Sequence, residues 1–414
     1  MRSNGSRVES RESKVAIDGV CAAESVAPDD AVAAAAMLAD AAARGQAVAP
    51  VGGGTALSLG NLPEQVDLIL STERLGGVID YEPTDLVLSV GAGARFGDVQ
   101  AVLGEHGQRL PFDPPGGSEA TIGGLIATAR WGPLRYSAGT LRDLLIGIAV
   151  AHPSGTVSHA GGMVVKNVSG YDMPRLYLGS LGTLGVIVSA NFKVLPRPRA
   201  EATVVGTCDG VESAFVAARR LHIDHEPIAA LEVARIDGRW LAAIRIEGRA
   251  ETVDVVTNRI ATTFGEEAQR IDGADSAAWW ADYVSQQDHA ATDQTVLIRC
   301  GVRPKATSVL ATEILATMNA LDVAVPYLAA SPGLGAVVAR LDFAATGSPE
   351  RLAEAQGLLL ALADTATILA APPAWKQGID VWGRMPEGFE VMESLRRQFD
   401  PARTVNPGRF AGFL

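Results

Sequence analysis

Two glycine-rich segments in the first third of the chain could bring backbone N–H groups close to a ligand. The first is Gly52-Gly53-Gly54-Thr55, and the second is DPPGGSEATIGGLIATA at residues 113–129. Without Cβ atoms in the way, the N–H groups of such a loop can converge on an anion. The first segment lacks the GK[ST] of a P-loop. A strand rather than a helix is expected after it, which disfavours a Rossmann dinucleotide site. A plain tight turn explains this segment about as well as a ligand does.

The second segment predicts a helix that begins at Ser118 and has almost no side chains on one face, because Ala120, Gly123, Gly124 and Ala127 follow. A glycine inside a helix costs roughly 0.5–1 kcal/mol relative to alanine. A ligand lying against the helix would justify two adjacent glycines, and the start of a helix offers free N–H groups to an anion. We therefore expect a flat, anionic cofactor here. Close packing of the helix on a sheet is the alternative.

A third segment, GGMVVKNVSGYDMPRLYLGSLGTLGVI at residues 161–187, follows the other two in the order and spacing of a known family. The chain resembles the vanillyl-alcohol-oxidase, or PCMH-type, FAD-binding family over about residues 30–200 and again in DPARTVNPGRF at 400–410. Within that family it is most similar to the branch that oxidises D-2-hydroxy acids. In that branch it looks most like the second of the two FAD-binding subunits that bacterial glycolate oxidases contain.

This resemblance implies the cofactor and its contacts. FAD should be bound without a covalent link, since Thr55 stands where covalently flavinylated relatives often carry histidine. The first glycine segment would hold the diphosphate, the second would lie along the ribityl chain and flavin, and residues 185–187 would face the adenine. The implied cofactor-binding residues are Gly52, Gly53, Gly54, Thr55, Ala56, Pro114, Gly117, Ser118, Thr121, Ile122, Gly123, Gly124, Thr128, Gly185, Val186, Ile187 and Asn406.

The resemblance also implies partners. The larger subunits of such complexes usually read GSEGTLG where this chain has Leu181 in GSLGTLG. They also carry a histidine-rich metal motif that this chain lacks. We therefore expect a larger FAD subunit of the GSEGTLG type and an iron–sulfur subunit as partners, with electrons relayed to them from glycolate or D-lactate. A self-sufficient oxidoreductase acting on another hydroxy acid or a sugar acid, and a non-catalytic assembly subunit, are the alternatives.

The catalytic residues are left unassigned. Oxidation of a 2-hydroxy acid needs a base for the hydroxyl proton and a cation for the carboxylate. We expect His106 to be an ordinary surface residue at a helix end, and His152 and His159 to be solvated. His222 and His225 are three apart, but two ligands do not make a zinc site. Three arginines, Arg130, Arg135 and Arg409, could meet a carboxylate, but surface or flavin-phosphate contacts explain them at least as well. His289 is a further histidine of the cap region, and Lys166 and Tyr171 are expected to brace the domain.

Helical and strand patterns alternate along the chain, which indicates an α+β class. The resemblance implies a PCMH-type, two-subdomain FAD-binding domain, and Pro196 and Pro198 mark a linker to a smaller α+β cap. The expected divisions are a flexible tail at 1–25, the FAD-binding domain at 26–200, the cap at 201–385 and a returning C-terminal segment at 386–414. Helices are expected at 29–44, 96–107, 118–129, 211–221 and 388–399, and strands at 47–51, 66–71, 85–93, 144–152, 184–195, 240–246 and 295–300.

Composition narrows the remaining function classes. The 414 residues carry 35 Lys and Arg against 47 Asp and Glu, a net charge of −12, which argues against a nucleic-acid binder. Three scattered cysteines cannot build an iron–sulfur cluster, which needs about four thiolates. The alanine run at 31–43 falls short of the ~20 apolar residues of a membrane span, and the polar N-terminus has no signal-peptide pattern. We expect a cytoplasmic protein that reaches a membrane only through partners.

Overall fold

Helix α1 (Ala31–Ala43) shows how the local sequence begins the fold. The carboxylate of Asp30 accepts a hydrogen bond from the N–H of Ala33 at 2.7 Å and so caps the helix. The buried face of α1 packs against a sheet in the order β1-β4-β6-β5, in which β4, β6 and β5 run parallel. These strands are β1 (Arg11–Glu12), β4 (Glu24–Val26), β6 (Leu68–Ser71) and β5 (Val48–Val51). The computed structural model describes residues 11–12, 15–163, 171–223, 227–287 and 292–414.

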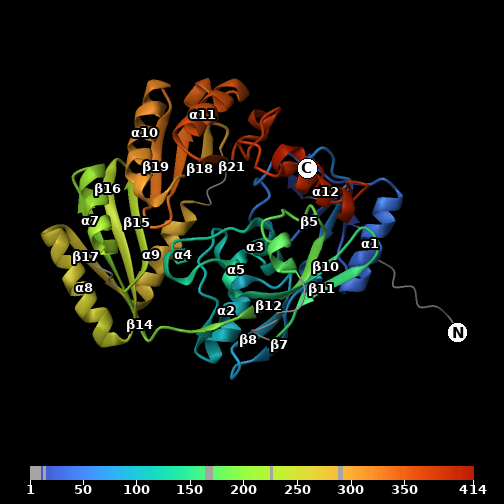
Figure 1. The fold of residues 1–414 in the computed structure, drawn as a ribbon, viewed down its shortest axis with the longest axis horizontal. Coiled ribbons are helices and arrows are strands. Elements are labelled where there is room, and N and C mark those ends of the chain that lie inside the picture. Colours follow the sequence, from blue (N-terminus) through green and yellow to red (C-terminus); the bar gives the residue numbers. More distant parts are fainter. Residues whose placement is uncertain (1–10, 13–14, 164–170, 224–226, 288–291) are drawn as a thin grey trace.

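A second sheet, antiparallel in the order β11-β10-β12-β8-β7, lies next to the first (Figure 1). One of its faces shares a core with α1, and the other packs on α2 and α3. The strands are β7 (Val78–Glu82), β8 (Val87–Gly91), β10 (Leu145–Ala151), β11 (Val157–Gly161) and β12 (Val186–Lys193). The helices of this part are α2 (Phe96–Glu105), α3 (Ile122–Thr128), α4 (Arg135–Ala138), α5 (Leu141–Leu144) and α6 (Met173–Tyr177).

The third sheet lies in the region expected to form the cap, which is called the cap below, and is antiparallel, in the order β17-β14-β16-β15-β19-β20-β18-β21. Its strands are β14 (Ala200–Cys208), β15 (Ile228–Ile236), β16 (Arg239–Gly248), β17 (Ala268–Asp272), β18 (Thr295–Gly301), β19 (Ala324–Ser331), β20 (Ala336–Asp342) and β21 (Thr365–Ala370). The helices of this part are α7 (Val211–Ile223), α8 (Ala250–Phe264), α9 (Gly273–Ser285), α10 (Thr307–Ala320) and α11 (Pro349–Leu362). Helices α7, α8, α10 and α11 bury one face of the sheet in a large apolar core.

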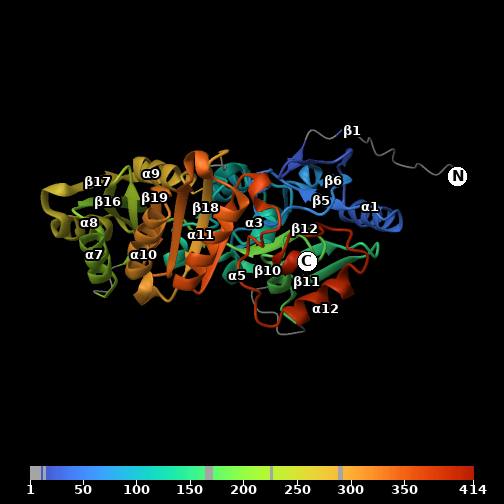
Figure 2. The same ribbon diagram turned by 90° about the horizontal axis from the view of Figure 1, so that it is seen from above.

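The two halves of the opposite face of the cap sheet differ. Over β14, β15, β16 and β19, helix α9 covers the sheet with Trp280 and Tyr283. Over β18, β20 and β21, a small apolar cluster of Leu297, Val338 and Ala370 faces the first half of the chain instead. Figure 2 shows these orange strands next to α3 and α5. The uncovered half of the sheet is therefore the wall that the cap offers to a site between the two parts.

The C-terminal segment returns to the first half of the chain, where both views show it in red beside β10 and β11 (Figures 1 and 2). Helix α12 (Phe389–Phe399) leads into a tail in which Val405 forms a parallel bridge to Val48. The N–H of Asn406 donates to the carbonyl of Val48 at 2.9 Å. Asn406 is thereby held alongside β5, and it lines the same cavity as the first glycine segment.

The segment expected to be a flexible tail, 1–25, contains short strands where the structure describes it. In its described part, β2 (Ala16–Ile17) and β3 (Val20–Cys21) pair as a hairpin and β4 joins the first sheet. Ile17 and Ala22 are buried. The apolar alternation of these strands is only two or three residues long, too short for a pattern to reveal. The other divisions of the chain stay a prediction.

Two local expectations also change. Ser118 does not begin the second glycine-segment helix; it lies in a short 3₁₀ turn, Gly117–Glu119, and Thr121 caps α3. The linker expected at Pro196 and Pro198 is partly paired, because β13 (Leu195–Pro196) bonds to β9 (Gln108–Arg109) before the chain enters β14. In the described residues, no helix combines the length and the hydropathy that a bilayer crossing requires.

Candidate active site

The first glycine segment leaves the end of β5 as a loop with free backbone donors. Among the described residues, none accepts a hydrogen bond from the N–H groups of Gly54, Thr55 or Ala56. Gly54 has φ +73°, a conformation that favours glycine. A Cβ on Gly52 would lie 2.0 Å from Thr121 Oγ1. The loop thus presses against the start of α3 while its N–H groups stay available to an anion.

The start of α3, in contrast, has no free donors in the structure. The N–H of Ile122 donates to Ala94 O at 3.0 Å and that of Gly123 to Ala92 O at 2.8 Å. The N–H of Gly124 donates to the hydroxyl of Thr121 at 3.4 Å. The expectation that this helix start offers free N–H groups to an anion is therefore wrong, because the neighbouring segment at 92–94 already accepts them.

Gly123 and Gly124 face different surroundings. A Cβ on Gly123 would lie 2.9 Å from the Cβ of Ala92, so this glycine allows the helix to pack closely on the second sheet. A Cβ on Gly124 would meet only the hydroxyl of Thr121, at 3.1 Å, and Gly124 lines a groove. The packing alternative thus applies to the first glycine, and the ligand interpretation is favoured for the second.

This groove runs between the first glycine segment, α3 and the segment before β12. It consists of two cavities of about 60 and 100 Å³ with shared walls that include Gly52, Gly124 and Asn406. The residues expected to contact the cofactor and found in these walls are Gly52, Gly53, Gly54, Thr55, Ala56, Thr121, Gly123, Gly124, Thr128, Gly185, Val186, Ile187 and Asn406. Most of the expected set is therefore brought together.

Four expected contacts do not line the groove. Ile122 is buried in the core beneath α3, Pro114 is buried, and Gly117 and Ser118 are exposed. Pro50, Pro115, Ala127 and Leu181 line it without having been expected. The backbone conformation of Leu181 marks it as a candidate site residue, because Leu181 and Asn406 both have positive φ, 51° and 47°. The two residues are also in contact, since the Asn406 amide donates to Leu181 O at 2.6 Å. Non-glycine residues in this region tend to cluster at functional sites.

A larger cavity of about 530 Å³ continues from the groove toward the cap. Thr55, Thr128 and Arg130 lie in the walls of both. The far wall is the uncovered half of the cap sheet. Its lining comes from both parts of the chain: Trp131, Gln287, Leu297, Arg299, Val338, Leu369, Ala370 and Trp382.

Cationic and aromatic side chains gather at this cavity. Arg130 donates to Thr55 O at 3.0 Å and so touches the first glycine segment. The guanidinium carbons of Arg135 and Arg299 lie 4.4 and 5.8 Å from the centre of the Trp131 ring. Burial, with Arg135 and Arg130 nearby, lowers the pKa of Arg299 to about 10. Glu119 at the rim is ion-paired with Arg95.

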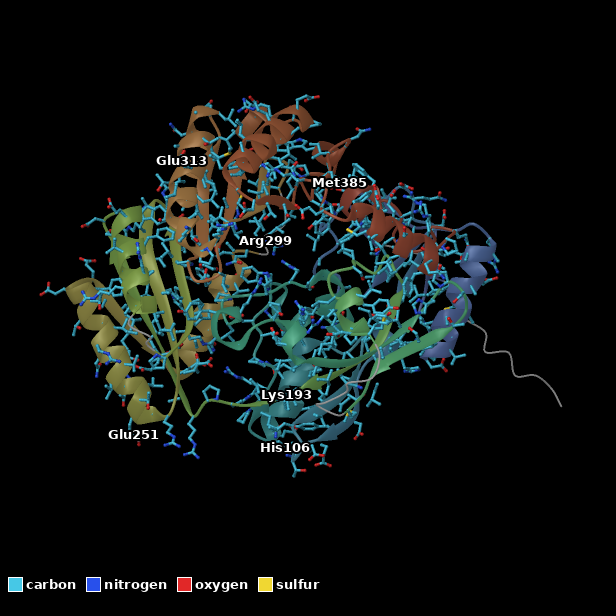
Figure 3. The ribbon with its side chains drawn as sticks, viewed as in Figure 1. His106, Lys193, Glu251, Arg299, Glu313 and Met385 are labelled. Carbon is cyan, nitrogen blue, oxygen red and sulfur yellow. The ribbon has the colours of Figure 1, made fainter. Side chains whose placement is uncertain are left out.

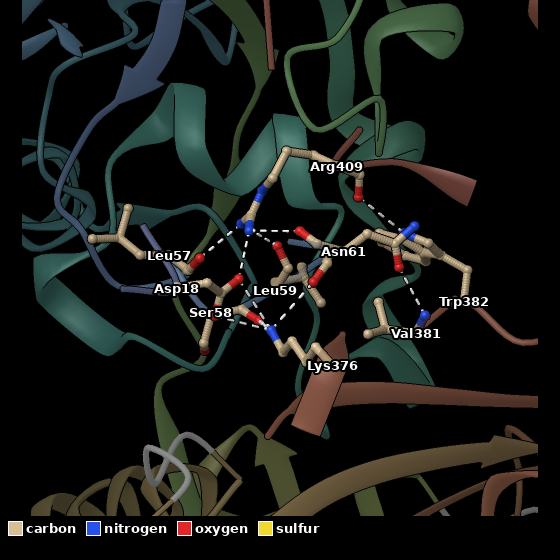
Figure 4. A network of polar contacts seen from close by, with 10 residues as sticks. Asp18, Leu57, Ser58, Leu59, Asn61, Lys376, Val381, Trp382 and Arg409 are labelled. Carbon is tan, nitrogen blue, oxygen red and sulfur yellow. Dashed lines mark hydrogen bonds and ion pairs between the residues drawn. The ribbon is translucent and has the colours of Figure 1, made fainter. Parts of the chain in front are cut away.

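Arg409 lines the groove, but its guanidinium is held by the protein itself. Its guanidinium is buried and donates to the carbonyls of Leu57, Leu59 and Asn61 and to the carboxylate of Asp18. Figure 4 shows these contacts converging from one side of the loop. The chain that follows the first glycine segment is thereby held in place.

The histidines do not form a metal site in the described residues, where no group of His, Cys, Asp and Glu could hold a metal ion. His106 ends α2 and His159 is exposed on β11, as expected. His152 is buried, not solvated: its ring nitrogens lie 2.8 Å from Ser158 Oγ and 3.3 Å from Leu184 O. Burial lowers its pKa.

The remaining residues considered in the sequence differ in what the structure describes of them. Tyr171 is 93% exposed and does not brace the domain through its ring. His222 lies near the end of α7. The residues Lys166, His225 and His289 lie outside the described residues.

Comparisons with known sequences agree with a cofactor-binding role for the groove. Residues 22–161 match the family described as FAD binding domain. Glycolate oxidase subunit GlcE of Escherichia coli is 43% identical over 129 residues, 31% of this chain and 37% of that protein. Glycolate oxidase subunit GlcD of Bacillus subtilis is 30% identical over 167 residues, 40% of this chain and 36% of that protein. D-lactate dehydrogenase of Archaeoglobus fulgidus is 28% identical over 400 residues, 86% and 84% of the two chains. The matches to the two glycolate oxidase subunits thus span well under half of their length.

Solved structures share the fold. p-Cresol methylhydroxylase superposes with a TM-score of 0.71 at 14% identity, over 94% of this chain and 89% of that chain. Chitooligosaccharide oxidase superposes with a TM-score of 0.67 at 14% identity, over 96% and 95%. The expected α+β, PCMH-type fold is confirmed. FAD is confirmed as the cofactor by the matched domain, and the free N–H groups beside Gly52 suit its diphosphate.

Proposed function

From the premise that this chain contains an FAD-binding domain of the PCMH type, we propose that it is an FAD-dependent oxidoreductase of D-2-hydroxy acids. The observation that carries the proposal is the continuity between the groove and the 530 Å³ cavity lined by Arg130 and Arg299. A cofactor bound along the first glycine segment would reach a chamber that offers cations to a carboxylate. The names of the relatives, which are glycolate oxidase subunits and D-lactate dehydrogenases, support this substrate class.

The reaction removes two hydrogens from the substrate. When bound, FAD would supply the acceptor for the hydrogen of C2 with both electrons, the hydroxyl proton would go to a base, and a 2-oxo acid would result. The proposed cofactor residues are those of the groove, with the free N–H groups of Gly54, Thr55 and Ala56 on the diphosphate. We assign no base, since Glu119, the carboxylate among the described residues of the cavity wall, is paired with Arg95.

We further propose that the chain is the FAD-binding subunit of a glycolate-oxidase-like complex, acting on glycolate or D-lactate. The 43% identity to a glycolate oxidase subunit supports this, although it covers 31% of the chain. The proposed partners are a larger FAD subunit of the GSEGTLG type and an iron–sulfur subunit, because the three cysteines here cannot hold a cluster. The proposed location is the cytoplasm, with any membrane contact made through those partners.

A self-sufficient oxidoreductase is the second candidate. The match to a D-lactate dehydrogenase over 86% of this chain favours it. Purification from the native host separates the two. The complex predicts a stable hetero-oligomer and slow dye reduction by the isolated chain with glycolate or D-lactate. Fast dye reduction by the pure chain would favour the self-sufficient enzyme. Loss of all dye reduction, in the isolated chain and in the purified complex, would overturn the oxidoreductase proposal and leave the assembly subunit.

A further inference from the structure

Arg299 is a charged residue on the half of the cap sheet that α9 leaves uncovered, where its neighbour on β21 is Thr367. Along β18, Val296, Ile298 and Cys300 face the helices, so Leu297 and Arg299 face the opposite way. The residue beside Arg299 on β20 is Val338. Burying a cation among such neighbours is unfavourable unless something compensates the charge.

Figure 3 labels Arg299 where the orange strands of the cap meet the FAD-binding part, and the side chain lines the 530 Å³ cavity. Within the described residues, Arg299 has no carboxylate partner and no hydrogen-bond acceptor. The guanidinium carbon lies 5.8 Å from the centre of the Trp131 ring. Five N–H donors are therefore held at the edge of an open space with no acceptor supplied by those residues.

The positive charges around Arg299 increase the free-energy cost of burying its guanidinium. Both Arg135 and Arg130 are close enough to lower the pKa of its guanidinium, as does burial. Among the described residues, two acidic groups near these arginines are engaged elsewhere: Glu119 pairs with Arg95, and Asp143 accepts from Thr140 at the exposed end of α5. An anion inside the cavity would compensate this excess of positive charge and fill the free donors.

The walls indicate the kind of anion. Leu297, Val338, Leu369 and Ala370 offer no hydrogen bonds from their side chains, whereas the planar guanidinium matches the two oxygens of a carboxylate. We propose that Arg299 anchors the substrate carboxylate, with the short carbon chain of the acid against this apolar wall, so that substrate binds to this chain itself. The inference rests on the proposed function and assigns to it a specificity-determining residue.

Oxalate is a suitable probe, because it offers carboxylates and has no hydrogen to lose. FAD-loaded full-length protein is titrated with oxalate while the flavin absorbance is followed. We expect saturable binding by the wild type. Replacing Arg299 by Met should weaken it about 10- to 100-fold, the range expected for losing a charge-assisted, bidentate contact. Arg299→Lys keeps the charge without the planar fork and should fall between the two.

Arg235→Met is the matched control. It removes a part-buried arginine from β15 of the same sheet, where the guanidinium donates to Val325 O at 2.9 Å, away from the cavity wall. Oxalate binding should be unchanged in it. Equal oxalate affinity in wild type and Arg299→Met, or in wild type and Arg299→Lys if the first variant does not fold, would overturn the inference. So would the absence of oxalate binding by the wild type.

The outcome is separable from that of the proposed function. If oxalate binding depends on Arg299 but neither the chain nor its complex oxidises glycolate or D-lactate, the anion site stands and the oxidoreductase proposal falls. If the acids are oxidised and the Arg299 variants retain the wild-type KM, the reaction stands and the role of Arg299 falls.

Discussion

The ammonium group of Lys376 lies 3.0 Å from the carboxylate of Asp18, and both side chains are buried. Lys376 also donates to the carbonyls of Ser58 and Gly60, and Arg409 shares the same carboxylate (Figure 4). One acidic group from the N-terminal hairpin thus compensates two cations from the last tenth of the chain. Together they hold the loop that follows the cofactor-binding glycines.

Replacing Asp18 by Asn should strongly destabilise the protein, because two cations would stay buried without their anion. Removing one partner of a buried pair costs about 3–5 kcal/mol, and urea unfolding measures it. The control is Glu64→Gln, which breaks the half-exposed pair with Arg403 at 2.6 Å and should cost under about 1 kcal/mol. A loss below about 1 kcal/mol in Asp18→Asn would contradict this account of the loop.

The sequence predicted the glycine groove because its signals are local. Gly52, Gly53 and Gly123 are positions where a side chain has little room, and their type alone points to close approach. The contacts of Asp18 could not be predicted, since Lys376 is 358 positions away and an isolated acidic residue in a polar segment has no pattern. The cap residues that line the 530 Å³ cavity were not predicted either, because they too come together from distant parts of the sequence. Arg299 gains its meaning only when β18 and β20 pair and Trp131 lies opposite.

The small error in the predicted start of α3 also has a local cause. Both Ser118 and Thr121 are good capping residues, and the sequence alone did not separate them. Gly116 and Gly117 both adopt positive φ, 91° and 51°, which delays the helix by one turn. The cap sheet was only partly expected, because strands such as β19 and β20 acquire their partners through pairing rather than through a motif.

Gly123 and Gly124 should respond differently to a larger side chain. Gly124→Val should abolish FAD binding in a protein that still folds, since this residue lines the groove. Gly123→Val should lower the melting temperature with or without FAD, because its Cβ would press on Ala92. Thermal melts at several FAD concentrations separate the two effects. Identical melting behaviour of the two variants would contradict the assignment of one glycine to packing and one to the ligand.

FAD should leave the protein on acid precipitation, because Thr55 at the expected attachment position has no nucleophilic imidazole. After precipitation and centrifugation, the yellow colour is expected in the supernatant. Thr55→Ala is the matched variant and should release FAD equally, since the hydroxyl forms no bond to it. Colour retained in the pellet would show a covalent link elsewhere.

Glu232 gives the fold a pH dependence of a defined sign. It is buried in the cap, where Tyr283 donates to it at 2.9 Å and Ser331 at 2.6 Å. Burial, with Asp113 nearby, raises its pKa to about 8. A carboxyl whose native pKa is raised is protonated in the native state while the unfolded chain is already ionised. The free energy of unfolding should therefore fall as the pH rises from about 5 to 8, with a slope of up to about 1.4 kcal/mol per pH unit for this group.

Asp113 adds to the same slope, because burial raises its pKa to about 7 despite hydrogen bonds from the N–H of Leu134 and the charge of Arg245. Glu232→Gln keeps an acceptor for Tyr283 and cannot ionise, so its unfolding free energy should depend less on pH and exceed that of the wild type at pH 8. The control, Glu350→Gln at the exposed start of α11, should keep the wild-type slope. Urea unfolding at pH 5, 6, 7 and 8 measures all three. An unchanged slope in Glu232→Gln would mean that the carboxyl of Glu232 is ionised throughout this range and that its hydroxyl donors outweigh burial.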